Sequence, residues 1–203
     1  MGHLALGYVI GKASAKFLKT EVSLPLIFTL SVLPDIDALF PFLIQHRGLT
    51  HSIIFAFIVF LSSFAVYRKK VVPYFAAFVQ HFLIGDYVAG GAQILWPITS
   101  RCYGINMCMR SLANITLEWT LFFLSIAIML KAGDLTIFFK THNSNMLLAI
   151  PTFTVLLPTL TGFPSDVPIL LIFPHLFYLC MFSASTIIQA LKMLTENSQE
   201  SPS

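Results

Sequence analysis

Long runs of apolar residues, separated by short polar stretches, dominate this chain. The run at 52–67 contains no charged residue and ends at Arg68-Lys69-Lys70. A helix needs roughly 20 apolar residues to cross a bilayer, so runs of this length predict transmembrane helices. The other long runs are 71–96, 111–130, 145–163 and 167–192.

Two shorter apolar pieces precede these runs. Residues 3–18 read as a helix with lysines near its end, and residues 23–33 stop at Pro34-Asp35. The pattern therefore predicts an all-α fold. We expect a polytopic integral membrane bundle of about six to seven helical pieces, two of them short or re-entrant.

We expect one membrane-embedded domain over residues 1–194. Within it, residues 1–98 contain the polar motifs described below, and residues 111–193 supply supporting transmembrane helices. The polar segment 195–203 predicts a disordered tail.

Composition supports a membrane protein. The mean hydropathy is +0.82 and only 10% of the residues are charged, which is typical of integral membrane proteins. The net charge of +3 is too small to indicate nucleic-acid binding. Cys102 and Cys108 lack a CxxC spacing, and the sequence leaves open whether they form a disulfide.

The basic residues predict an orientation. When the helical pieces alternate across a membrane, nine of the 12 basic residues fall on one side: Lys12, Lys16, Lys19, Arg68, Lys69, Lys70, Lys131, Lys140 and Lys192. Basic residues in short loops stay in the cytoplasm. We therefore expect a multi-pass cell-membrane protein with a cytoplasmic C-terminus, and with His3 and the loop HRGLTHS (46–52) facing outward.

Histidines and aspartates gather at the outward face of this arrangement. They lie in the motifs LPDID, HRGLTHS and HFLIGD and at the start of the chain, and they are His3, Asp35, Asp37, His46, His51, His81 and Asp86. A charged side chain in lipid costs roughly 2.5–3.5 kcal/mol on the insertion scale, and neighbouring carboxylates also repel one another. A divalent metal neutralises carboxylates and accepts imidazole nitrogens, so we predict a metal site. The absence of cysteine from the set favours zinc, with manganese or iron as alternatives, and the number of donors suits one or two ions.

Each motif also has a structural interpretation when it is taken alone. LPDID is compatible with a helix stop and an aspartate cap. In THS, Thr50 or Ser52 is compatible with a helix N-cap. A single histidine such as His81 is compatible with a hydrogen bond between helices. The gathering of these motifs in residues 1–90 favours the metal site.

Three residues are candidates for a catalytic role. Asp37 is a candidate bridging ligand or base. Arg47 lies between two candidate ligands and suits a phosphate group, or alternatively a salt bridge to Asp35 or Asp37. Glu118 is the one acid in the run 111–130; it suits a base or ligand, or alternatively a hydrogen bond to another helix.

The ordered motifs resemble a known family. MGHLALGYVIGK, LPDID, HRGLTHS, HFLIGDYVAGG and a following WP are similar to the YdjM/YbcI-type family of predicted membrane-bound metal-dependent hydrolases, over roughly residues 1–98. The resemblance implies a multi-pass membrane protein with a His/Asp metal site, and it assigns the family's motif residues to the seven positions named above.

Two classes of function follow. The first is a metal-dependent hydrolase that opens at the outer leaflet and acts on a lipid or lipid-linked ester or phosphoester, so that membrane lipids are its partners. The second is a non-catalytic protein that binds a metal for a structural, sensing or transport role. A scaffold in which the histidines and aspartates only bridge helices is a third possibility.

Overall fold

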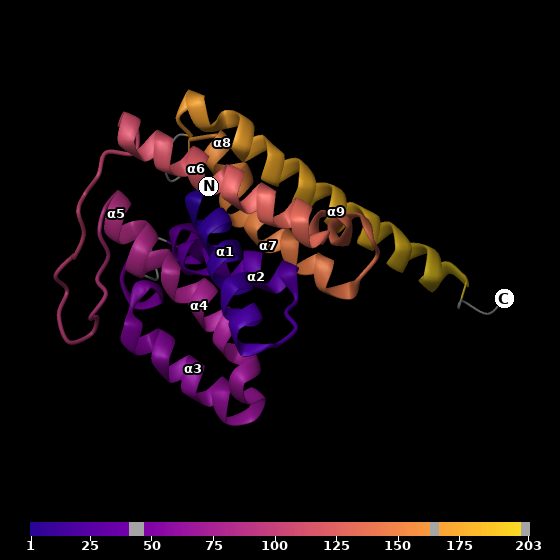
Figure 1. The fold of residues 1–203 in the computed structure, drawn as a ribbon, viewed down its shortest axis with the longest axis horizontal. Helices are drawn as coiled ribbons and strands as arrows, with labels where there is room; N and C mark the ends of the chain where they lie inside the picture. The colour runs from indigo at the N-terminus through magenta and orange to yellow at the C-terminus, as the bar shows by residue number, and fades with distance from the viewer. Residues whose placement is uncertain (41–46, 163–166, 200–203) are drawn as a thin grey trace.

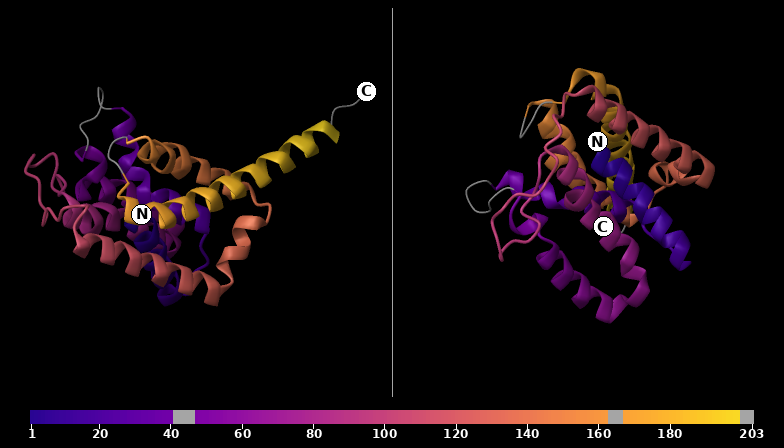
Figure 2. Two further views of the ribbon diagram at one scale, coloured as in Figure 1. Left: turned by 90° about the horizontal axis from the view of Figure 1, so that it is seen from above. Right: turned by 60° about the vertical axis from the view of Figure 1, so that its left-hand side comes forward.

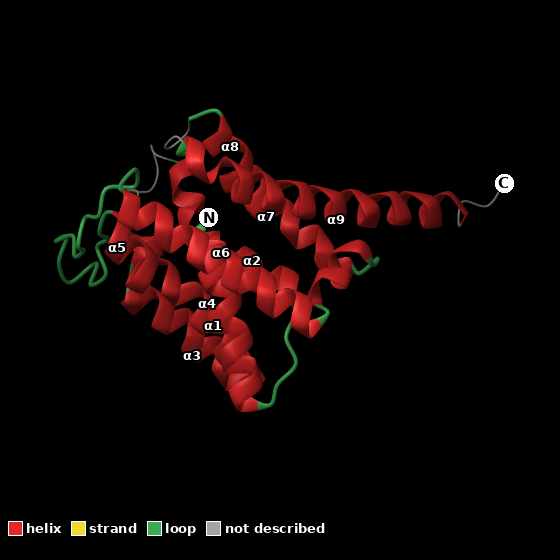
Figure 3. Cartoon of the chain, turned by 45° about the horizontal axis from the view of Figure 1, so that its top comes forward, coloured by secondary structure: helices red, strands yellow, loops and turns green. Residues whose placement is uncertain are grey.

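A computed structural model describes residues 1–40, 47–162 and 167–199 of the chain. All regular elements in these ranges are helical (Figure 3), and the single strand-like pairing among them is an isolated bridge between Ala92 and Tyr103. The predicted all-α fold is confirmed.

Four helices of the first half form one side of the molecule (Figure 1): α1 (Gly2–Leu18), α2 (Leu24–Val32), α3 (Ile53–Tyr67) and α4 (Val72–Gln80). Pro25 stands in the first turn of α2, where a missing amide hydrogen costs nothing. Ser52 caps α3, because its hydroxyl accepts the amide hydrogens of Ile54 and Phe55. The N-cap interpretation of THS is therefore right for Ser52.

Short helical turns connect these helices. They are the 3₁₀ turns η1 (Leu33–Leu39), η2 (Leu49–His51) and η3 (Arg68–Val71), the π-helical turn η4 (His81–Asp86) and the single turn α5 (Tyr87–Ala89). The helix α2 ends at Val32, directly before LPDID, so the helix-stop interpretation is right, but no side chain caps η1 and the aspartate-cap part is wrong. The helix that begins at α4 ends at Ala89, and extended chain follows Gly91. The expectation that the run 71–96 forms one helix is thus wrong for its last part.

The second half contains two long helices and several short pieces. The elements are α6 (Leu112–Ala132), η5 (Asp134–Phe139), η6 (Asn143–Leu148), α7 (Ala149–Pro151), the π-helical turn η7 (Thr152–Leu156), α8 (Leu157–Leu160), η8 (Ile169–Leu171) and α9 (Ile172–Gln199). The run 145–163 is divided into short pieces that contain Pro151 and Pro158. A proline lacks the amide hydrogen that a continuous helix requires, which explains why one long helix does not form there.

Within the described residues, two helical segments are long and apolar enough to cross a membrane: Leu112–Ala132 and Ile169–Glu196. They overlap in Figure 1 but diverge in the view from above (Figure 2), and they meet where Phe122 packs against Tyr178 with 5.9 Å between ring centroids. The end of α9 projects away from the other helices and continues past the predicted domain boundary at residue 194. The polytopic arrangement is supported for these two segments.

An aromatic core joins the two halves of the chain. The Phe28 ring is fully buried and contacts four other rings, from α1, η5 and α9: Tyr8, Phe138, Tyr178 and Phe182. Ridges of side chains on packed helices interlock at such points. The position of α2 against α9 is therefore fixed by Phe28.

Close packing sets the position of α1 on α2 and α4. A side chain at Gly7 would overlap Ser31 of α2. The Gln80 amide at the end of α4 donates to the backbone oxygen of His3 at 3.1 Å. At the other end of α1, Lys12 pairs with Asp134 at 2.7 Å, which ties α1 to the segment after α6. The start of α1 is consequently held beside the end of α4.

Candidate metal centre

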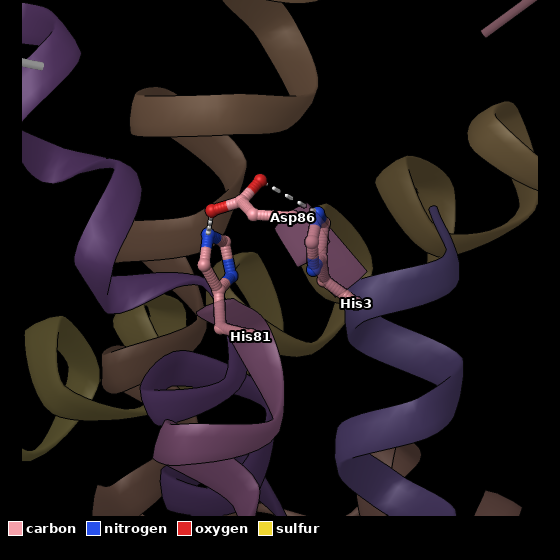
Figure 4. Close-up of side chains that lie close together, drawn as sticks. All are labelled: His3, His81 and Asp86. Carbon is pink, nitrogen blue, oxygen red and sulfur yellow. Dashed lines mark ion pairs between the residues drawn. The ribbon is translucent and has the colours of Figure 1, made fainter. Parts of the chain in front are cut away.

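Five of the predicted ligands come together where four segments meet. His3 lies in the first turn of α1, Asp35 in η1, His51 at the end of η2, and His81 and Asp86 at the two ends of η4. Two overlapping groups of these residues could hold a metal ion: His3, His81 and Asp86, and Asp35, His51 and His81. Figure 4 shows the first group. His46 lies outside the described residues.

Four donor atoms from three turns face one another, and we call them the donor quartet: Nε2 of His51, Nε2 of His81, Oδ1 of Asp35 and Oδ2 of Asp86. Asp86 Oδ2 lies 3.1 Å from the His51 nitrogen and 3.5 Å from the His81 nitrogen. Asp35 Oδ1 lies 3.8 Å and 3.3 Å from the same two nitrogens. A tetrahedral zinc ion with bonds of about 2.0–2.1 Å sets its ligand atoms roughly 3.3–3.4 Å apart. Each atom of the donor quartet thus lies 3.1–3.8 Å from two others, close to the spacing of ligands on one ion, and the groups whose donor atoms all lie within 4.8 Å of one another contain three residues each.

The hydrogen bonding of His81 prepares its ring for an ion. Its Nδ1 lies 2.8 Å from the backbone oxygen of Ser31, which can only accept, so Nδ1 carries the proton and Nε2 presents a lone pair. Nε2 of His81 and Oδ2 of Asp86 are buried and make no hydrogen bond within the described part of the chain. Two acceptors that face each other at 3.5 Å repel unless a proton on Nε2 or a cation between them supplies positive charge, and a divalent cation is one group that meets this need.

Asp37 occupies a different position from the other predicted ligands. Its Oδ2 accepts hydrogen bonds from the Arg47 amide at 3.0 Å and from the Thr50 hydroxyl at 2.7 Å, and it lies 3.3 Å from Nδ1 of His51. The Asp37 carboxylate is fully buried. It thus contacts the ring edge of His51 that faces away from the donor quartet, which is the usual place for a carboxylate that orients a metal-binding histidine.

The π-helical turn η4 brings His81 and Asp86 to one face. In an α-helix, residues five apart differ by about 140° around the axis, because each residue advances about 100°. In a π-helix the hydrogen bonds join residues five apart, so such residues stand nearly above one another. The HFLIGD spacing fits the donor quartet only because this turn is π-helical.

His3 extends the site to the other oxygen of Asp86. The His3 ring stacks on His81 with 4.0 Å between centroids, and its Nε2 lies 3.9 Å from Oδ1 of Asp86. In Figure 4 the Asp86 carboxylate stands between the two imidazoles, with one oxygen toward each. A carboxylate that faces two sets of donors in this way can bridge two ions.

Gly85 has no side chain and therefore leaves room for the His3 ring. A side chain at residue 85 would overlap that ring. We expect Gly85→Ala to displace His3 and to weaken metal binding about 10- to 100-fold, as does the loss of other orienting contacts. Metal titration of the purified protein measures this effect.

A double substitution provides the control for this prediction. His3→Ala should weaken binding by a similar factor, and the variant with both changes should bind no more weakly than His3→Ala alone, because residues acting through one contact are not additive. Additive losses would contradict the prediction and show that Gly85 acts independently of His3.

Arg47 connects two of the acidic motifs. Its backbone has a left-handed φ of 63° and its amide binds Asp37, while its guanidinium lies 3.5 Å from Asp86 and donates to the Gly91 oxygen at 3.2 Å. One predicted role of Arg47 was a guanidinium salt bridge to Asp35 or Asp37. The guanidinium forms its salt bridge with Asp86 instead, so the predicted partner is wrong. A side chain at Gly90 would overlap the guanidinium, so the Gly90-Gly91 pair both ends the helix and makes room for Arg47.

Glu118 reaches the same region from α6. Its Oε2 accepts the Gly2 amide hydrogen at 2.6 Å, one residue before His3. This contact agrees with the interpretation of Glu118 as a hydrogen-bond partner of another helix. It holds the first turn of α1, and with it His3, at the edge of the site.

A cavity of about 400 Å³ adjoins the metal centre. One wall contains His3, Asp35, Arg47 and Asp86. The opposite wall comes from the second half of the chain and includes Asn114, Thr154, Leu156, Leu171 and His175. Sequence reasoning assigned only a supporting role to this half and missed the wall, because no polar motif marks it. Nε2 of His175 bonds to the Leu156 oxygen at 2.8 Å, so this histidine shapes the wall.

The ordered set of motifs and the clustered histidines and aspartates agree with a comparison to protein families. The chain matches the family described as YdjM inner membrane protein over residues 1–166. It belongs to this family. The match extends beyond residue 98, where the motifs end, and membership of the YdjM family places the chain in the cell membrane. Searches of curated proteins and of solved structures found no match.

The cysteines take no part in the site. Cys102, Cys108 and Cys180 are free and exposed. The open question of a Cys102–Cys108 disulfide is thus answered in the negative for this structure of the YdjM family member.

Proposed function

We propose that this YdjM family member is a membrane-bound, metal-dependent hydrolase that acts on a lipid or lipid-linked ester or phosphoester. The observation that carries the proposal is the donor quartet, in which neighbouring donor atoms lie 3.1–3.8 Å apart beside a cavity. A structural metal site is closed to other ligands, whereas a catalytic site keeps a position that water or substrate can reach. Here the side chain of Asp35 is 25% exposed, which leaves one side of the site open.

The ligands follow from the geometry. Asp35, His51, His81 and Asp86 would hold the first ion, with zinc favoured and manganese or iron as alternatives. His3 and the second oxygen of Asp86 would contribute to a second ion. Such an ion supplies Lewis acidity and an activated water. Asp37 acts as a positioning residue for His51, in place of the ligand or base role predicted for it.

Arg47 and Asp35 are the residues that meet the substrate. The Arg47 guanidinium lines the cavity and suits the charge that develops on a phosphoester or carboxylic ester oxygen. Asp35 lines the same wall, and its partly exposed side chain would face the substrate there. Glu118 keeps its role in positioning the start of α1.

The two walls of the cavity match the two parts of a lipid. Charged residues line one wall, and apolar residues such as Val155, Val167 and Leu171 line part of the other. Together with the family's membrane location, this supports a membrane lipid as the substrate and gives no role to nucleic acid. The basic-residue bias supports a metal site on the outer face and a cytoplasmic C-terminus.

The test uses the full chain in vesicles that contain labelled phospholipids. We expect lipid turnover that a chelator abolishes and that added zinc or manganese restores. Stoichiometric metal without turnover on ester and phosphoester panels would favour the non-catalytic metal-binding alternative. Absence of metal from the purified protein would favour a scaffold.

Arg47→Lys tests the role of the guanidinium. A lysine keeps the charge but loses the planar pair of donors, so we expect unchanged metal content and turnover of a phosphoester reduced about tenfold or more. Elemental analysis and a turnover assay measure the two quantities. Arg101→Lys, at an exposed arginine of the same side, should change neither. Loss of metal from Arg47→Lys would instead assign Arg47 to holding the ligands.

A further inference from the structure

A second, larger cavity lies away from the metal centre. It is a groove of about 650 Å³ between α2, α3 and α4, and none of the residues of the donor quartet lines it. Its volume falls within the range of roughly 300–1,000 Å³ that is common for small-molecule sites. We call it the α3 groove.

Apolar and aromatic side chains form the walls of the α3 groove. They come mainly from α3 and α4 and include Phe55, Val59, Phe60, Phe75 and Phe78. The rings of Phe60 and Phe75 pack together with 4.2 Å between centroids. In α3, Ala56 is the one buried residue, so most of this helix is exposed. In a protein of the inner membrane, such a surface meets acyl chains.

The α3 groove has a charged end. Lys70 and Tyr67 line it there, together with Tyr74 and Glu21. Lys70 is the last residue of the exposed run Arg68-Lys69-Lys70, so two further basic residues directly precede the lysine that lines the groove. Tyrosines and lysines are typical of the level at which lipid headgroups lie. The charge at this end thus complements an anionic headgroup.

We propose that the α3 groove binds one acyl chain of an anionic phospholipid whose phosphate lies at Arg68–Lys70. An apolar channel with an excess of basic residues at one end matches a molecule that has an acyl chain and a phosphate. The site is separate from the metal centre, and the proposal does not depend on hydrolase activity.

Photo-crosslinking of the full chain tests the proposal. The protein is reconstituted in phosphatidylcholine vesicles that contain phosphatidylglycerol with a photoreactive group on one acyl chain, and the labelled peptides are identified. We expect labelling concentrated on the groove-lining residues of α3 and α4. Val59→Trp fills the groove and should reduce labelling to the level of the outer face of α3.

Val66→Trp is the matched control. Val66 lies on α3 and is exposed, like Val59, but it does not line the groove. In Val66→Trp the labelling of the groove-lining residues should equal that of the unaltered protein. Circular dichroism should show the same helix content for Val59→Trp and Val66→Trp. Labelling spread evenly over the exposed residues of α3, or equal losses in both variants, would overturn the acyl-chain site.

Charge reversal tests the headgroup. Lys70→Glu should reduce labelling by the phosphatidylglycerol probe about fivefold or more, because basic residues attract anionic lipid. Lys16→Glu makes the same change at an exposed lysine outside the groove and should leave labelling unchanged. Equal labelling by a phosphatidylcholine probe, unaffected by Lys70→Glu, would overturn the anionic-headgroup assignment.

Discussion

Asp86→Asn is expected to abolish metal binding and, with it, any metal-dependent turnover. Asp86 faces His51 and His81 with one oxygen and His3 with the other, so its carboxylate links the donor quartet to His3. An amide is neutral and a poorer ligand than a carboxylate, so the substitution removes one of the two carboxylates that face the two buried imidazoles. We expect metal content below about a tenth of that of the unaltered protein, measured by elemental analysis of the purified full chain.

Asp37→Asn provides the matched comparison, because it makes the same change at a second buried aspartate of the site. Asp37 contacts Nδ1 of His51 and does not belong to the donor quartet. We expect metal to remain bound, with an affinity about 10- to 100-fold lower, as is typical when a residue that orients a ligand is changed. If Asp37→Asn lost the metal while Asp86→Asn retained it, the assignment of ligand and positioning residue would be reversed.

Phe28→Ala is expected to have the largest effect on stability. Phe28 is fully buried and contacts rings from α1, η5 and α9, so its removal leaves a cavity at the junction of the two halves. Replacement of a buried phenylalanine with alanine costs about 3–5 kcal/mol. Unfolding in detergent, followed by circular dichroism, should show this loss.

Phe139→Ala is the control for this prediction. Phe139 carries the same side chain but is 61% exposed. Its replacement should change the free energy of unfolding by less than about 0.5 kcal/mol. Equal losses in the two variants would contradict a core centred on Phe28.

The pattern of residues predicted the helical class of this fold and the region of the site. Uncharged runs such as 52–67 indicate helices directly. The cost of isolated charges in an apolar chain indicates that Asp35, His81 and Asp86 need a common partner. These inferences succeed because they depend on periodicity and charge, which a single sequence contains.

Other features depend on contacts between distant residues, and the sequence could not supply them. The π-helical form of η4 decides which residue shares a face with His81, yet no local signal distinguishes it from an α-helix. The partner of Arg47 was misjudged because Asp86 lies nearer in space than the acids that precede Arg47 in sequence. The division of the run 145–163 into short helical pieces has a local signal in Pro151 and Pro158, because a proline lacks the amide hydrogen of a continuous α-helix.

The order of the residues along the chain bears on how the site is assembled. The described donor atoms all belong to residues 3–86, whereas the opposite wall of the cavity belongs to residues after 111. A ribosome makes the chain from its N-terminus, so the described donor set is synthesised before the wall that covers it. An ion can therefore enter while the nascent site is still uncovered, and delivery of the metal does not require a finished cavity to open.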